Sequence, residues 1–167
     1  MKRILAVLLF YFIASPALAT PLYAGIQIGD DSAGVLFGFR INQTYAVETH
    51  YTKSNASSTN AGLTVDTAST GVGVVGLAMF PMKLGDVAPY DLFVKAGYQH
   101  TSSTDTYSIP TSVTLTQPYS GTLSSQKNQL IFGAGAEFGF AKYLTGRAGL
   151  DFIGKKRHLN LGFIFRF

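Results

Sequence analysis

Four charged residues stand within otherwise apolar segments of the sequence, where a lone charge is energetically costly. They are Glu48, Lys95, Glu137 and Arg147. Two carboxylates and two cations can neutralise one another through ion pairs, whereas an unpaired buried charge is strongly destabilising. The first requirement on the fold is therefore that it gathers these four side chains in one enclosed place.

The three histidines, His50, His100 and His158, decide whether hydrolytic or metal chemistry is available. A serine nucleophile needs a base within hydrogen-bond reach, and of the three histidines only His100, which precedes Thr101, Ser102 and Ser103, has serines beside it. Polar groups of this kind are usually just solvated. No two histidines stand at metal-ligand spacing on one strand. We therefore predict no catalytic residues, no enzyme activity and no metal site.

Two glycine-rich stretches imitate nucleotide-binding motifs. The glycines at 71, 73 and 76 have the spacing of the dinucleotide fingerprint, but that motif must lie between a strand and a helix. Here a Ser/Thr-rich segment precedes it and Pro81 soon follows. The stretch 149–156 approaches a phosphate loop, but Lys156 stands where a serine or threonine must coordinate magnesium. We predict no cofactor.

The first nineteen residues have the features of a secretory signal peptide. Lys2 and Arg3 precede the apolar run 4–14, and a small-residue cleavage pattern ends at Ala19. The run is too short to cross the roughly 30 Å of a bilayer core as a helix. We predict that residues 1–19 are removed and that 20–167 form one domain. Export also removes nucleic acid as a partner for the formal charge of +4.

The rest of the chain alternates between large apolar residues and small or polar ones, which is the period of a β-strand. Only 13% of residues are charged, against about 25% in soluble domains. Each alternating segment is near the 9–11 residues that a tilted transmembrane strand needs. The eight segments are 22–29, 35–41, 45–51, 71–80, 92–99, 129–138, 143–152 and 158–167. For the segment 71–80, the sequence does not decide which face of the strand meets lipid.

The charges lie on the opposite face of these strands from the large apolar side chains. The inward set includes Arg40, Asp151 and Arg166 as well as the four residues above. A soluble barrel has the reverse pattern, with its polar side outward. A lysine or arginine facing lipid near the bilayer centre costs about 2–4 kcal/mol. We therefore predict an all-β fold: an eight-stranded antiparallel up-and-down transmembrane β-barrel, following a cleaved signal peptide.

The connections alternate in length, as in outer-membrane barrels. Short turns are expected at 42–44, 83–89 and 141–142, and longer Ser/Thr-rich segments at 53–70 and 100–127. An even number of strands places both termini on the periplasmic side of a bacterial outer membrane.

Three stretches carry a resemblance to a known family: Tyr45-Ala-Val-Glu48, Phe152-Ile-Gly-Lys155 and the terminal segment 159–167. The chain resembles the small OmpA/OmpX/NspA-like outer-membrane barrels. The resemblance implies that Phe163, Phe165 and Phe167 form the signal read by the outer-membrane insertion machinery. It also implies a charge network in the lumen, in which we pair Glu137 with Arg147 and Glu48 with Lys95. Such a network either plugs the barrel or gates a narrow pore.

The long segment 100–127 is the candidate contact surface. It carries Tyr107, Ile109, Val113, Leu115 and Tyr119 in a Ser/Thr background, and the alternation in 111–116 suggests a hairpin that continues beyond the membrane. An exposed strand edge can recruit another chain. A structural or adhesin-like role toward a host or surface protein is one hypothesis. The alternative is a narrow porin or a hydrophobic-ligand transporter. Lys127 and the basic run 155–157 suit lipopolysaccharide and other outer-membrane lipids.

Overall fold

The computed structural model describes residues 22–60, 62–83, 90–109 and 119–167. The predicted signal peptide, most of the turn 83–89 and the tip of the hairpin at 110–118 lie outside this range. Within it, no helix is long and apolar enough to cross a membrane.

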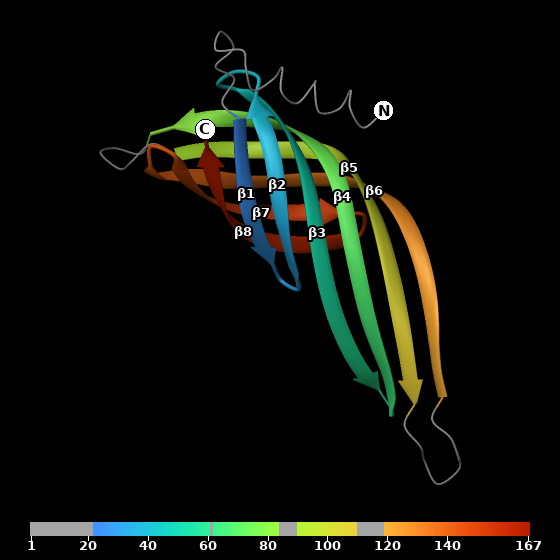
Figure 1. Ribbon diagram of the computed structural model, residues 1–167. Coiled ribbons are helices and arrows are strands. Elements are labelled where there is room, and N and C mark those ends of the chain that lie inside the picture. The colour runs from blue at the N-terminus through green and yellow to red at the C-terminus, as the bar shows by residue number, and fades with distance from the viewer. Residues whose placement is uncertain (1–21, 61, 84–89, 110–118) are drawn as a thin grey trace, which may run out of the picture.

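Eight antiparallel strands close into a barrel in sequence order (Figure 1). The ring closes where β1 pairs with β8, from Tyr23 opposite Arg166 to Gly29 opposite Asn160. The described ends of the chain meet there, because the Phe167 N–H donates to the Leu22 carbonyl at 3.0 Å. The strands are β1 (Leu22–Gly29), β2 (Ser32–Arg40), β3 (Tyr45–Asn60), β4 (Leu63–Met82), β5 (Tyr90–Ile109), β6 (Tyr119–Ala141), β7 (Leu144–Ile153) and β8 (Lys156–Arg166). The predicted all-β fold, an eight-stranded antiparallel up-and-down barrel, is confirmed.

The outer surface of the barrel is apolar and its interior holds the charges. Among the described residues, exposed large hydrophobic side chains greatly outnumber buried hydrophobic ones, and Glu48, Glu137 and Arg147 are buried. Tyr45, Phe138 and Phe165 are among the exposed aromatics. A water-soluble barrel would hide these side chains, so this surface is built to face hydrocarbon.

The orientation of β4, which the sequence leaves open, is now defined. Val72, Val74 and Phe80 face outward, whereas Val75, Leu77 and Met79 are buried inside. The inner three join an apolar cluster with residues of other strands, including Tyr23 of β1 and Phe93 of β5. The interior is therefore not lined only by small and polar residues, as the general alternation suggests, but has an apolar core beside its charges.

Glycines make room for two of the aromatic rings that point inward, those of Tyr23 and Phe93. A Cβ atom on Gly38 would lie 2.5 Å from Cζ of Tyr23, and one on Gly135 would lie 2.6 Å from Cζ of Phe93. Cβ atoms do not approach other side chains so closely, so both rings depend on the missing side chain. The inner face therefore has a glycine at the positions against which a large ring packs.

Strands β3 to β6 continue well beyond the barrel as a curved four-stranded sheet (Figure 1). We call the part formed by 55–60, 63–70, 101–109 and 119–127 the extension. β4 has 20 residues, about ten more than the membrane requires, which adds roughly 30 Å at 3.3 Å per residue. The predicted continuation of the fifth and sixth strands is confirmed, because β5 and β6 pair out to Ile109 and Tyr119.

The expectation of a loop at 53–70 is wrong. This segment forms the paired ends of β3 and β4, which turn tightly at Gly62, a residue with φ of 84°. Cross-strand hydrogen bonds between short polar side chains hold the extension, such as Thr67 to Asp105 at 2.7 Å and Ser69 to Ser103 at 2.8 Å. Threonine is a good strand former, so a Ser/Thr-rich segment can extend a sheet when such partners face it.

The turn at 42–44 is confirmed, and its cause is local. The Asn42 side-chain oxygen accepts hydrogen bonds from the N–H groups of Thr44 at 2.8 Å and Tyr45 at 2.7 Å. An asparagine that bonds to the backbone two or three residues ahead mimics a turn. This contact returns the chain directly into β3.

The outward position of Val74 can be tested by substitution. Val74→Arg should lower the free energy of unfolding in lipid vesicles by about 2–4 kcal/mol, the cost of an arginine on the lipid face near mid-bilayer. Val74→Leu, which keeps the site apolar, should change it little. Urea titration of the refolded variants measures both. Equal stability of the arginine and leucine variants would contradict the assigned face.

Candidate functional site

Arg147 lies at the centre of the lumen and holds two carboxylates. Its Nη1 donates to Oε2 of Glu48 at 2.9 Å and its Nε to Oε1 of Glu137 at 3.0 Å. All three residues are at most 6% exposed. The guanidinium also lies 4.9 Å from the centre of the Phe93 ring, within range of a cation–π interaction. The fork of donors on arginine suits this double contact.

The network extends from this centre across the lumen. Oε2 of Glu137 also accepts hydrogen bonds from Arg40 and Arg166, each at 2.9 Å. Arg40 further contacts Asp91 at 3.0 Å, and the Tyr23 hydroxyl donates to Glu48 at 2.7 Å. Three arginines therefore balance three carboxylates, so the buried charges are paired and hydrogen-bonded, which is the condition for tolerating them.

The predicted partners are right for one pair and wrong for the other. Arg147 contacts Glu137, as expected for neighbouring strands, but Lys95 does not pair with Glu48. Lys95 Nζ lies 2.8 Å from Asp151, and Glu48 is taken by Arg147. The reason is the register: Lys95 is opposite Gly133, which is opposite Asp151. Because Gly133 has no side chain, the Lys95 side chain reaches across β6 to Asp151 on β7.

Sequence reasoning missed two members of the network, Tyr23 and Asp91. Both could have been found from the alternation of faces along a strand, in which every second residue points the same way. Asp91 is four residues before Lys95, so the two point to the same face of β5, and Tyr23 shares the inner face of β1 with Gly25. Each stands at a strand end, where the apolar alternation that marks a strand has only begun.

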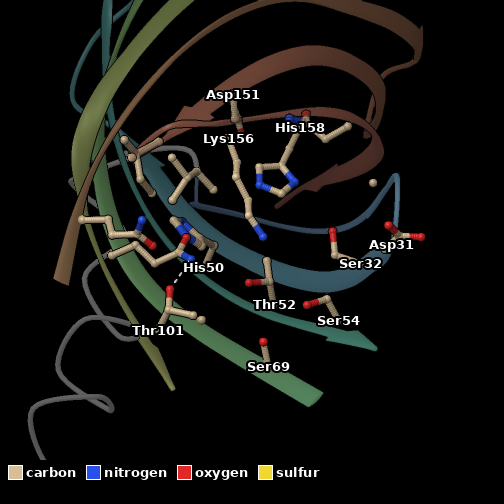
Figure 2. A pocket seen from close by; sticks show the side chains of 18 of the residues that line it. Asp31, Ser32, His50, Thr52, Ser54, Ser69, Thr101, Asp151, Lys156 and His158 are labelled. Atoms are coloured by element: carbon tan, nitrogen blue, oxygen red, sulfur yellow. Dashed lines mark hydrogen bonds between the residues drawn. The ribbon is translucent and has the colours of Figure 1, made fainter. Parts of the chain in front are cut away.

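A cavity of about 520 Å³ occupies the other half of the lumen, toward the extension (Figure 2). Its lining runs from Lys95 and Asp151 to Ser103 and Lys127. The arginine network lies on the side of the chain ends. The lumen is thus a polar cup that is open toward the extension and closed by the network.

The histidines are placed apart. The His50 ring contacts Gln99 at 3.0 Å inside the cup, and the His100 ring contacts Asn128 at 2.7 Å on the outer face. The Ser103 hydroxyl is bonded to Ser69, so among the described residues the His100 ring bonds Asn128 rather than Ser103. In the described residues no cluster of three histidine or acidic side chains could hold a metal ion.

The remaining sequence candidates lie at the two ends of the molecule. Phe163, Phe165 and Phe167 are exposed at the end of the chain. Tyr107 and Ile109 lie on β5 in the extension and are half-buried, and Tyr119 begins β6. Val113 and Leu115 fall outside the described residues.

Comparison with solved structures identifies the architecture. The barrel superposes on the N-terminal β-barrel domain of Pseudomonas aeruginosa OprF with a TM-score of 0.61 at 15% identity, covering 89% of this chain and 98% of that one. Neisserial surface protein A gives 0.57 at 13% identity, covering 89% and 96%. Acinetobacter baumannii CarO gives 0.54 at 12% identity, covering 88% and 98%. No protein-family model and no curated protein sequence matches the chain.

The central role of Arg147 predicts a large loss of stability on substitution. Arg147→Met leaves Glu48 and Glu137 buried with fewer partners and should lower the free energy of unfolding by about 3–5 kcal/mol. Arg157→Met makes the same chemical change at an exposed position of β8 and should cost less than about 0.5 kcal/mol. Urea unfolding of both refolded variants provides the comparison, and equal effects would show that the network does not stabilise the barrel.

Proposed function

We propose that this chain, which has the fold of the small eight-stranded outer-membrane barrels, is an integral outer-membrane protein with a closed lumen that binds another protein through its extension. The apolar outer surface supports the membrane location. The observation that carries the binding role is the extension itself, a paired sheet far longer than a membrane span requires.

The arginine network argues against a general pore. Eight strands enclose a space that side chains can fill, and here the paired Arg147 also contacts the ring of Phe93, a member of the buried apolar cluster. Opening a path would separate buried charges from their partners, which is costly. These contacts favour a plug over a gate, and a surface role over transport.

The extension has two free strand edges. β2 pairs with β3 only as far as Ser54, and β7 pairs with β6 only as far as Ile131. Within the extension, the outer edges of 55–60 and of 119–127 therefore have no neighbouring strand in the described residues. These segments contain no proline, and Lys127 is their single charged residue, so they have few of the features that protect edges from pairing. An extended segment of a partner could add to such an edge.

The inner face of the extension adds apolar contacts. Val65 pairs with Tyr107 across β4 and β5. Leu123 on β6, which is 58% exposed, faces Asp105 and is therefore a diagonal neighbour of Tyr107. We infer that this patch, defined by Val65, Tyr107 and Leu123, gives the partner its side-chain contacts. Tyr107 belongs to the contacts predicted from sequence, and the other two residues join it through the register.

Orientation and assembly follow the same proposal. Chain ends on the periplasmic side place the extension outside the cell, and Lys127 with the basic run 155–157 then stands at the level of lipopolysaccharide headgroups. Neisserial surface protein A, which shares the fold, is by its name a surface protein. We propose that Phe163, Phe165 and Phe167 serve as the signal for the insertion machinery.

The proposed surface role predicts a loss of attachment on shortening the extension. Bacteria that display the full chain should adhere to cultured epithelial cells, and deletion of residues 104–122 should reduce adherence to the level of cells without the protein. Tyr107→Ser with Leu123→Ser should reduce it severalfold, because apolar anchors dominate protein interfaces.

The matched control is Thr106→Ala with Thr122→Ala, a facing pair on the exposed outer side of the same hairpin. It should leave adherence unchanged. Surface labelling confirms equal display of each variant. Undiminished adherence after the deletion would refute the role of the extension.

A further inference from the structure

The free edge of β6 has backbone groups whose direction the structure defines. β3 and β6 form the two margins of the extension (Figure 1). The Gly154 N–H donates to the Leu130 carbonyl at 3.3 Å, so the backbone groups of Leu130 point away from β5, toward the β7 side. Successive residues of a strand direct their backbone groups to opposite edges. Those of Asn128, Gln126 and Ser124 therefore also point to the β7 side.

These backbone groups have no neighbouring strand in the described residues, because β7 pairs with β6 only as far as Ile131. On its other side β6 stays paired with β5 out to Tyr119, so a further strand can join without breaking that ladder. Leu123, which is 58% exposed on this edge, would then gain a neighbouring side chain on the added strand. The edge of β3 at 55–60 has no large apolar residue. β6 is therefore the edge that offers both ladder groups and an apolar anchor.

The two edges start beside turns of opposite charge. Next to the base of the β6 edge, the link from β7 into β8 carries Lys155, Lys156 and Arg157, and all three are exposed. Next to the base of the β3 edge, the link from β1 to β2 carries Asp30 and Asp31. None of the three basic residues forms an ion pair within the described chain. A strand added to β6 therefore has positive charge beside its end nearest the barrel.

We propose that the partner supplies an extended segment that pairs antiparallel with the free edge of β6 and begins with acidic residues. β6 runs from the far end of the extension toward the barrel, so an antiparallel strand starts at the barrel. Its first residues then lie beside Lys155 and Lys156, which attract carboxylates. Antiparallel pairing is also slightly more stable than parallel pairing. This inference rests on the binding role proposed above and adds the edge, the direction and the charge of the partner.

Two synthetic peptides test the direction and the charge together. Both alternate threonine and valine and are capped at each end, but one begins with two glutamates and the other ends with them. Their composition and net charge are therefore equal. Titration calorimetry with the refolded chain in non-ionic detergent micelles should show about tenfold tighter binding of the peptide that begins with glutamates. Equal affinities, tighter binding of the other peptide, or no binding of either would overturn the proposal.

A proline on the edge tests where the peptide pairs. Ser124→Pro removes an N–H that points away from β5, so the ladder between β5 and β6 stays intact, as for prolines tolerated on edge strands. It should weaken binding of the peptide that begins with glutamates by about tenfold, because a strand can no longer bond there. Ser124→Ala removes the same hydroxyl and should bind as the parent chain does. Parent-like binding by a proline variant with an unchanged urea midpoint would refute the edge.

Charge variants test the basic end of the edge independently of the proline. Lys155→Gln with Lys156→Gln changes only exposed positions and should remove the preference between the two peptides. Lys53→Gln, an exposed lysine on β3, is the control and should keep the preference. A preserved preference in the double variant would overturn the assigned direction. If adherence depends on residues 104–122 but neither peptide binds, the surface role is retained and this inference alone fails.

Discussion

The contact of Arg147 with Glu48 and Glu137 is the interaction on which the rest of the structure depends. A barrel that faces lipid must turn its charges inward, and an interior without bulk water tolerates them only in pairs. Arginine suits the centre because its planar fork reaches two carboxylates at once, which the single ammonium of lysine cannot do with the same geometry. The other strands supply the partners that complete the balance.

Lipid on the outside is also what makes most of the fold readable from the sequence. Where one face of a strand is apolar and the other carries a charge, the face that meets lipid is determined, as in β6 and β7. The segment 71–80 has no charge on either face, so its orientation could not be assigned. The segment 53–70 lies largely beyond the apolar belt, where lipid no longer imposes alternation, and its strand character depends on cross-strand partners.

The candidate site was predictable in its members but only partly in its pairs. Strand order brings Glu137 beside Arg147, and parity places Lys95 and Asp151 inside. Strand order and parity do not reveal how far a side chain can reach, because that depends on the size of the residue on the strand in between. Gly133 stands between Lys95 and Asp151, and its missing side chain determines which acid the lysine meets. The shape of the cup depends on the same three-dimensional detail.

The measurement that tests the closed lumen most directly is single-channel conductance of refolded residues 20–167, the predicted mature chain, in a planar bilayer. A lumen plugged around Arg147 predicts silence from the unchanged protein, with current appearing when Arg147→Ala removes the central cation. Steady openings of the unchanged chain would contradict the plug and would make the charge network part of a pore.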